Sequence, residues 1–216
     1  MKIVYILVVA IVLIVPTYFF IDESVARYIM SNKYATPILV DIDGVEFSIP
    51  KYATFYRVSG YLSEAAVSTY FLVVSALLWG YFKFRRKIEL YAIRAAFFFL
   101  SVALSGIVTN ILKFIFGKAR PRVLESDNFF GFTWFNFESS YHSFPSGHTT
   151  TAFAIFMSLT LMFPKYWWIF LSYAVTMALA RIGYYAHYPS DTIAGAAIGM
   201  SVTLLLYRYW KSKLSI

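Results

Sequence analysis

Six long apolar runs dominate this chain of 216 residues and limit what it can fold into. The runs are Ile3–Phe20, Ala65–Phe82, Ala92–Leu112, Thr149–Phe163, Tyr166–Ala180 and Asp191–Tyr209. A helix needs about 20 mostly apolar residues to cross a hydrocarbon core about 30 Å thick. Lipid offers the backbone no hydrogen-bond partners, so such runs cross a bilayer as helices. The sequence therefore predicts an all-α fold: a six-transmembrane-helix bundle with a small extramembrane segment over residues 21–64.

The composition agrees with this prediction. Hydrophobic residues make up 60% of the chain and charged residues only 14%, whereas about 25% of a typical soluble domain is charged. The chain has no cysteine, which excludes disulfide bonds, thiolate chemistry and zinc sites built on cysteine. We expect a single integral membrane domain over residues 1–216, with the motif-bearing core over about 92–209.

The basic residues gather in particular loops, and this distribution predicts the orientation of the helices. Residues 81–94 carry five basic side chains and one acid, whereas residues 21–64 carry four basic and six acidic side chains. Lys and Arg are enriched in short cytoplasmic loops, so both termini are expected in the cytoplasm. Basic clusters in membrane proteins contact anionic lipid. We therefore expect the bilayer as a partner and no nucleic acid; the oligomeric state stays open.

The first run and the segment after it allow more than one interpretation. Ile3–Phe20 resembles a secretory signal peptide, because Lys2 precedes it and Ser24-Val25-Ala26 follows; we expect a retained membrane helix. Val25–Met30 fits a short interfacial helix, and Ile38–Ile49 fits two short strands joined at Asp43-Gly44. Residues 21–64 form either an ordinary connection or a lid or headgroup wall over a site.

Three polar clusters interrupt the apolar pattern, and the first is Lys113-x6-Arg120-Pro121, with Lys118 and Arg122 beside it. Arg presents a planar fork that matches phosphate oxygens, and Lys is a compact point charge. Pro121 prevents a helix from continuing and helps to aim Arg120. The alternative is a basic boundary cluster that contacts lipid headgroups. The outer location predicted for this cluster argues against that alternative.

The second cluster, Pro145-Ser146-Gly147-His148, stands directly before the fourth apolar run. Gly147 lets the backbone approach an anion closely, and the start of a helix offers free N–H groups to phosphate. Ser146 adds a hydroxyl, and His148 adds a titratable imidazole. Taken alone, the cluster fits a helix cap with an incidental histidine equally well.

The third cluster, Arg181-x5-His187-x3-Asp191, connects the last two apolar runs. Asp191 either caps a helix start or bonds one imidazole nitrogen of His187 and leaves the other available for attack. Pro189 leaves open whether the pair lies on one helical turn. The helix count puts all three clusters on the outer side of the membrane.

In residue type, spacing and order, the three clusters resemble the signature of the type 2 phosphatidic acid phosphatase superfamily. That signature reads Lys-x6-Arg-Pro, Pro-Ser-Gly-His and Ser-Arg-x5-His-x3-Asp, and the match extends from Lys113 to Asp191. One position departs, because Ala180 stands where the family has Ser. A phosphate contact made by that hydroxyl is then absent or supplied elsewhere. The resemblance implies a bacterial membrane lipid phosphatase of the inner (plasma) membrane, with its site on the periplasmic or extracellular side.

The resemblance also implies a division of roles. His187, oriented by Asp191, attacks phosphorus and forms a phosphohistidine. His148 protonates the leaving group and then activates water. Five residues hold the phosphate: Lys113, Arg120, Ser146, Gly147 and Arg181.

We expect no metal and no cofactor at this site. Three fixed cations can replace a metal as the partner of phosphate. The acids Glu125, Asp127 and Glu138 are too dispersed to suggest a Mg²⁺ site, and activity is expected to survive excess EDTA. A metal site at His148, His187 and Asp191 is the weaker hypothesis, because several cationic side chains are expected at the same site.

The sequence leaves the substrate and the reaction partner open. Candidate substrates are undecaprenyl pyrophosphate, phosphatidylglycerol phosphate, phosphatidic acid and the phosphates of lipid A. The alternatives to hydrolysis are a lipid-to-lipid phosphotransferase with the same phosphohistidine and a phosphate- or anion-binding transporter with no nucleophile. His142 has no role in the signature and is expected to be a polar loop residue. The aromatic run Phe129–Phe137 is expected to dip into the interface.

Overall fold

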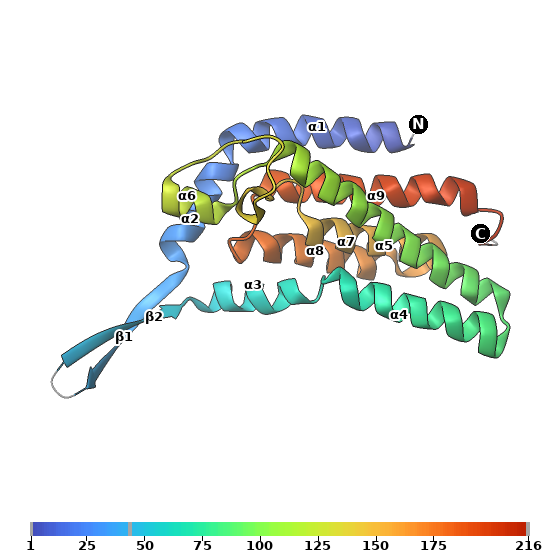
Figure 1. Ribbon diagram of the computed structural model, residues 1–216, viewed down its shortest axis with the longest axis horizontal. Helices are drawn as coiled ribbons and strands as arrows, with labels where there is room; N and C mark the ends of the chain where they lie inside the picture. Colours follow the sequence, from blue (N-terminus) through green and yellow to red (C-terminus); the bar gives the residue numbers. More distant parts are fainter. Residues whose placement is uncertain (1, 43–44, 215–216) are drawn as a thin grey trace.

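The computed structural model describes residues 2–42 and 45–214 (Figure 1). Over these residues the chain is helical apart from its loops and one hairpin. The longer elements are α1 (Lys2–Phe20), α2 (Asp22–Asn32), β1 (Tyr34–Ile42), β2 (Val45–Tyr52), α3 (Thr54–Glu64), α4 (Ser68–Gly80), α5 (Glu89–Phe116), α6 (Pro121–Asp127), α7 (Gly147–Met162), α8 (Trp167–Gly183) and α9 (Pro189–Trp210). Short helical turns are η1 (Tyr81–Arg86), η2 (Ser139–Tyr141) and η3 (Pro164–Tyr166).

All six apolar runs are helical, which confirms the helical membrane architecture. Four helical stretches within the described ranges are long and apolar enough to span a bilayer: Lys2–Phe20, Thr54–Arg86, Glu89–Phe116 and Pro189–Trp210. α7 and α8 have 16 and 17 residues, fewer than the roughly 20 that a full crossing usually needs. The count of six complete crossings therefore stays a prediction.

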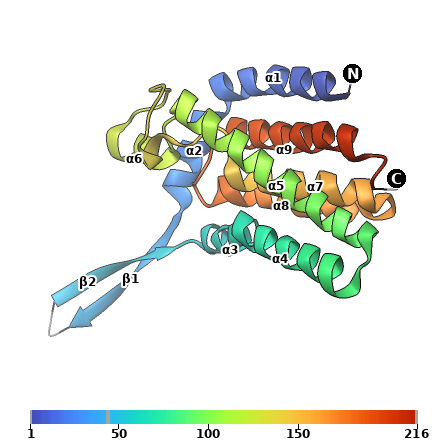
Figure 2. The same cartoon turned by 45° about the vertical axis from the view of Figure 1, so that its right-hand side comes forward.

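The long helices lie side by side, and the two ends of the bundle differ. Figures 1 and 2 show the start of α1, the end of α9 and the α4–α5 connection at one end. α2, α6 and the hairpin lie at the other end. The segments before α6, α7 and α9 also lie there, so the three polar clusters share one end, opposite the termini.

Two glycines on α9 set the distance between the helices that carry the second and third clusters. A Cβ atom at Gly195 would lie 2.6 Å from the carbonyl oxygen of Ser146, and one at Gly199 would collide with the backbone of Thr150. Small residues permit such close approach between membrane helices. α9 therefore packs directly against the first turns of α7. From the other side, Thr109 of α5 donates a hydrogen bond to Thr150, at 3.0 Å.

The outer segment differs in part from its prediction. α2 confirms the helix expected over Val25–Met30, and β1 and β2 pair antiparallel around the expected hairpin. The turn predicted at Asp43-Gly44 lies outside the described residues. The second membrane helix was expected to begin at Ala65, but helical structure begins at Thr54, and α3 is separated from α4 by a short break. Polar side chains such as Arg57 obscure this boundary in the sequence, because they lie among tyrosines at the outer end of the helix.

Candidate active site

The first cluster leaves the end of α5 through a glycine turn. Gly117 has φ +55°, and a Cβ there would lie 2.9 Å from the backbone nitrogen of Trp134. A glycine in this left-handed conformation is a common helix end. The Gly117 N–H donates to the carbonyl of Lys113, at 3.0 Å. The turn thus leaves Lys113 on the helix and directs Lys118 and Arg120 into the site end of the bundle.

Lys113 and Arg120 are held by backbone contacts. The Lys113 ammonium donates to the carbonyl oxygen of His142, at 2.5 Å, and its Cε lies 3.8 Å from where a Cβ of Gly147 would be. Arg120 directly precedes α6, whose first residue is Pro121, and its N–H donates to the Ser140 carbonyl at 2.9 Å. Burial, followed by repulsion from Arg122, lowers the pKa of Arg120. An arginine still carries its charge at neutral pH.

The second cluster begins α7. Ser146 is completely buried at the N-terminal boundary of the helix, and its hydroxyl accepts a hydrogen bond from Thr149 at 3.1 Å. The Ser146 N–H donates to the backbone carbonyl of Asp191, at 3.0 Å. This bond joins the second cluster to the third through the main chain. His148 follows Gly147 and lines a cavity of about 180 Å³ together with Asn110.

In the third cluster, Arg181 is anchored from a helix that the sequence motifs do not include. Its Nη1 donates to the hydroxyl of Ser63 on α3, at 2.5 Å. α3 can approach α8 closely because Gly183 faces Ser59. The Nε atoms of Arg120 and Arg181 are buried without a hydrogen-bond partner in the described part of the chain. Both guanidinium groups therefore keep an N–H donor for a ligand.

His187 lies in the loop between α8 and α9 and is 3% exposed. Its backbone N–H donates to the Arg181 carbonyl, at 3.3 Å. The distance from His187 Nδ1 to Asp191 Oδ2 is 3.6 Å, beyond a hydrogen bond. Burial lowers the pKa of the His187 imidazole well below its ordinary value, while Asp191 acts in the opposite direction. The ring is therefore neutral at pH 7.

Asp191 has more partners than the sequence indicates. Its Oδ2 accepts hydrogen bonds from the Ser143 hydroxyl at 2.6 Å and from the Tyr188 N–H at 2.9 Å. Its Oδ1 accepts one from the Lys118 ammonium at 2.8 Å. Asp191 thus caps α9 through the Tyr188 N–H, while the bond to an imidazole nitrogen of His187, the other alternative left open by the sequence, stays a prediction.

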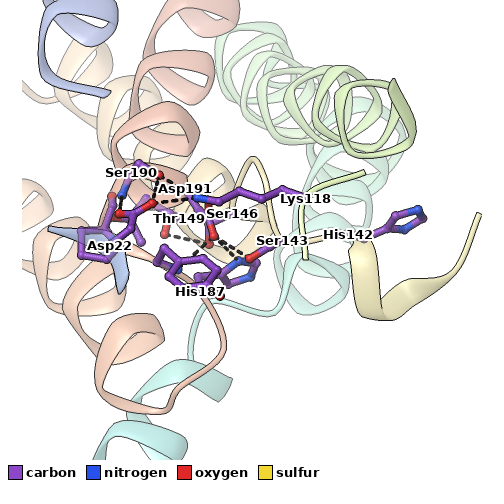
Figure 3. A network of polar contacts seen from close by, with 12 residues as sticks. Asp22, Lys118, His142, Ser143, Ser146, Thr149, His187, Ser190 and Asp191 are labelled. Atoms are coloured by element: carbon purple, nitrogen blue, oxygen red, sulfur yellow. Dashed lines mark hydrogen bonds and ion pairs between the residues drawn. The ribbon is translucent and has the colours of Figure 1, made fainter. Parts of the chain in front are cut away.

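Lys118 belongs to a buried charge cluster, which we call the Asp22–Lys118–Asp191 cluster. Figure 3 shows its ammonium among Asp22, Ser190 and Asp191, with bonds of 2.7 Å to Asp22 and 2.9 Å to Ser190. The Ser190 N–H and hydroxyl donate to Asp22, at 2.9 and 2.5 Å. The side chains of both carboxylates and of Lys118 are 0% exposed.

The structure therefore brings together all eight residues singled out by the sequence and adds four others. The predicted residues are Lys113, Arg120, Ser146, Gly147, His148, Arg181, His187 and Asp191. The additional residues are Asp22, Ser63, Lys118 and Ser143. The position of Lys118 inside the first motif is the sequence feature that points to it. No sequence pattern points to Asp22, Ser63 or Ser143.

His142 lies outside this arrangement. Its ring Nε2 is 2.7 Å from the carbonyl oxygen of Asn136, and Figure 3 shows it on the far side of the network from Asp22. Its backbone carbonyl, rather than its ring, contacts Lys113. Over residues 2–42 and 45–214, no three His, Asp or Glu side chains form a group that could hold a metal ion. The functional groups around the site are mainly cationic, which suits an anionic ligand.

Comparison with known proteins gives relatives in sequence and in structure. Lipid A 1-phosphatases from Rhizobium etli and Rhizobium johnstonii are each 42% identical to this chain over 100 residues, which is 46% of this chain. The match spans 43% and 41% of those relatives. The Aquifex aeolicus LpxE crystal structure has a TM-score of 0.58 at 22% identity and covers 87% of this chain and 95% of its own.

A second solved structure shares the same fold. It is the first transmembrane PAP2 type phosphatidylglycerolphosphate phosphatase from Bacillus subtilis, with a TM-score of 0.58 at 15% identity, covering 98% of this chain and 96% of its own. The family model of the PAP2 superfamily matches residues 94–214, more than half of the chain. These residues contain every motif of the signature, and the chain belongs to the PAP2 superfamily.

Proposed function

We propose that this protein is a membrane lipid phosphatase that works through a phosphohistidine intermediate. The observation that supports this most is the meeting of Lys113, Arg120 and Arg181 with two histidines at one end of a membrane helix bundle. Cations bind the phosphate, and a buried neutral imidazole supplies a lone pair for attack. The roles of His187, His148 and Asp191 in the two chemical steps are part of this proposal.

In the first step, the Nε2 lone pair of His187 forms a bond to phosphorus while the bond between phosphorus and the lipid oxygen breaks. His148 gives a proton to that leaving oxygen. In the second step, His148 takes a proton from water, and the hydroxide oxygen attacks phosphorus. The bond between phosphorus and His187 breaks, and phosphate leaves. Asp191 keeps Nδ1 of His187 oriented in both steps.

The groups proposed to hold the phosphate oxygens keep hydrogen-bond donors that no other group in the described part of the chain accepts. Among the described residues, the buried Nε–H groups of Arg120 and Arg181 have no partner, and a buried donor without a partner is costly unless a ligand satisfies it. Lys113 and the first N–H groups of α7 complete the cradle. These donors stabilise the charge that develops on the phosphoryl oxygens in the transition state.

For the substrate, we propose a lipid whose phosphate is attached to a sugar headgroup, lipid A being the first candidate. The relatives from Rhizobium carry the name lipid A 1-phosphatase. Beside Arg181, a cavity of about 350 Å³ is lined by Tyr52, Tyr56, Arg57, Gly60, Tyr61, Glu64 and Tyr184. Aromatic rings with polar tips suit the faces and hydroxyls of a sugar. Residues 21–64 would then form a headgroup wall rather than a simple connection.

The cavity gives a test that separates headgroups. Tyr56→Ala removes a ring whose centroid lies 5.0 Å from that of Tyr184, and it should raise the KM for lipid A by about three- to tenfold. The KM for phosphatidic acid should stay the same. Tyr28→Ala, on α2 and outside this cavity, is the matched control. An equal change for both lipids would contradict the proposed sugar site.

The proposed activity itself is tested by a phosphate-release panel. The purified chain is compared with His187→Ala on lipid A, undecaprenyl pyrophosphate, phosphatidylglycerol phosphate and phosphatidic acid. The native chain should release phosphate from at least one lipid, and His187→Ala should release none. Absence of release from every lipid would overturn the proposal. Transfer of phosphate to an added acceptor lipid would identify a phosphotransferase, and flux retained in His187→Ala would identify a transporter.

We also propose a single membrane domain of six crossings in a bacterial inner membrane, with both termini cytoplasmic and the site outside. The loop charges and the separation of the termini from the polar clusters support this orientation. The chain has no cysteine, so single exposed cysteines can report sidedness cleanly. In intact spheroplasts, a membrane-impermeant maleimide should label Glu138→Cys and spare Ser212→Cys. The reverse pattern would invert the topology.

A further inference from the structure

The Asp22–Lys118–Asp191 cluster lies beneath the proposed nucleophile and is sealed from water. The ammonium of Lys118 is surrounded by aromatic rings, the nearest being Tyr188 at 4.5 Å and Tyr18 at 5.0 Å from the ring centroids. All three charged side chains are fully buried. Charges interact strongly in such a place, because the effective dielectric constant is far below that of water.

Asp22 is an anion in this arrangement. Its Oδ1 accepts the Ser190 N–H, and its Oδ2 accepts the Ser190 hydroxyl and a Lys118 N–H. Ser190 already accepts a hydrogen bond from Lys118 through the same oxygen, so its one hydroxyl proton points to Asp22. Burial raises the pKa of Asp22, while Lys118 and Ser190 oppose that effect. The charge of Asp191 also raises this pKa, and the hydrogen bonds that reach the carboxylate in the described part of the chain are all donated to it.

The charges of the cluster do not cancel. Two carboxylates share a single ammonium, so the cluster carries one net negative charge. When Nε2 of His187 bonds to phosphorus and Nδ1 keeps its proton, the imidazole ring acquires one positive charge. The nearest carboxylate oxygen to that ring is Oδ2 of Asp191, 3.6 Å from Nδ1. A cluster with one net negative charge balances the ring, whereas a neutral cluster does not.

We propose that Asp22 is a positioning residue for the phosphatase reaction: it takes half of the ion pairing of Lys118 and thereby leaves Asp191 able to stabilise the phosphohistidine. This role rests on the proposed function. It also assigns part of the site to residues outside the family region, because Asp22 begins α2 and the family match begins at residue 94. The N-terminal part of the chain is then needed for turnover.

A set of charge variants tests this role, with phosphate release as the measurement. Asp22→Asn makes the cluster neutral and should lower kcat by at least about tenfold, with KM within about twofold because the phosphate-binding residues are unchanged. Asp22→Glu keeps the charge and should retain more activity than Asp22→Asn. Glu23→Gln is the matched control, since Glu23 is half exposed and pairs with Arg27 on the surface.

The double variant separates a charge role from a structural one. Lys118→Met alone leaves two buried carboxylates and should also be nearly inactive. Asp22→Asn combined with Lys118→Met restores one net negative charge, on Asp191. Its kcat should exceed that of either single variant, a recovery that a merely structural loss would not give. Thermal unfolding in detergent identifies variants that fail to fold. If Lys118→Met or the double variant fails, the comparison of Asp22→Glu with Asp22→Asn carries the test.

The outcomes distinguish the role of Asp22 from the proposed function. A native chain that is active, an inactive His187→Ala and an Asp22→Asn variant with native kcat would overturn the role of Asp22 alone. A double variant whose kcat does not exceed that of both single variants would do the same. A native chain that releases no phosphate from any lipid would overturn the proposed function and the role of Asp22 with it.

Discussion

His187 and Asp191 face each other across 3.6 Å, between Nδ1 of the ring and Oδ2 of the carboxylate. The carboxylate is fixed by Lys118, Ser143 and the Tyr188 N–H, at 2.6–2.9 Å, whereas Nδ1 of the ring has no hydrogen-bond partner among the described residues. The histidine is therefore the partner that must move to close the gap. Catalytic hydrogen bonds are often long in the free enzyme and shorten when substrate binds.

Replacing the carboxylate by an amide should abolish most of the turnover. Asp191→Asn keeps the shape but cannot hold the correct tautomer of His187, and it leaves Lys118 with a single carboxylate. We expect kcat to fall by about 10³-fold or more, measured as phosphate release. Asp127→Asn, at the exposed end of α6, should have no effect. A kcat of Asp191→Asn within about threefold of the native value would remove Asp191 from the mechanism.

The two histidines near the second cluster should behave differently. His148→Ala removes the proposed general acid and should lower kcat by about 10²- to 10⁴-fold. His142→Ala should change kcat little, because its ring lies against the Asn136 carbonyl and its backbone, which the substitution keeps, holds Lys113.

A substrate with a better leaving group gives the control for the acid role. An aryl phosphate needs less protonation of the departing oxygen, so His148→Ala should lose less activity on it than on a lipid phosphate. Equal losses on both substrates would mean that His148 acts by binding rather than by proton transfer.

Ser63 should affect substrate binding through Arg181. Ser63→Ala leaves a buried guanidinium N–H unpaired, which typically costs about 1–3 kcal/mol. We expect KM to rise by about five- to tenfold with kcat nearly unchanged. Ser59→Ala, one turn earlier on α3, is the control. A purely structural effect would instead lower the unfolding temperature of both variants and leave KM of the folded fraction unchanged.

Burial of neutral His187 should make stability depend on pH. Its pKa is lower in the folded chain than in the unfolded chain, so below about pH 6.5 the unfolded chain binds a proton that the folded chain does not. The stability that the neutral His187 ring gives the folded chain is therefore complete above that pH. As the pH falls, the free energy of unfolding decreases by at most about 1.4 kcal/mol per pH unit. The loss of thermal stability from pH 7.5 to 5 should be smaller in His187→Gln. An identical loss in both proteins would contradict a neutral buried imidazole.

Removal of metal should leave activity intact. Three cations hold the phosphate in the proposed mechanism, so excess EDTA should not lower phosphate release. The matched measurement adds Mg²⁺ or Zn²⁺ back after chelation. Activity that disappears with EDTA and returns with one of these ions would replace the metal-independent mechanism.

The sequence predicts the fold well where lipid leaves no alternative. Apolar runs of this length can only be helices in a bilayer, and each one is helical here. The start of α3 is missed because Thr54–Glu64 mixes tyrosines with Arg57 and Glu64, which reads as a polar connection. Such a stretch becomes helical through its packing on α8, a contact that no local pattern encodes.

The candidate site, like the fold, is predicted from the sequence only in part. The signature residues are recognisable because their spacing is fixed along the chain. Asp22 and Ser63 are not, because their partners Ser190 and Arg181 lie 168 and 118 residues away. In the sequence, Asp22 is a single acid after an apolar run, a pattern typical of an ordinary interfacial residue. Only the fold shows that it lies beside Lys118.

The glycine contacts between α7 and α9 have a consequence for how new specificity can arise. Since even one added carbon at Gly195 would strike the Ser146 backbone, this helix pair admits no gradual change of shape. The α3 face, with its cavity of tyrosines beside Arg181, is open to substitution without moving the reacting groups. Natural variation and laboratory evolution that alter lipid choice should therefore accumulate on α3, while the helix pair that carries the chemistry stays constant.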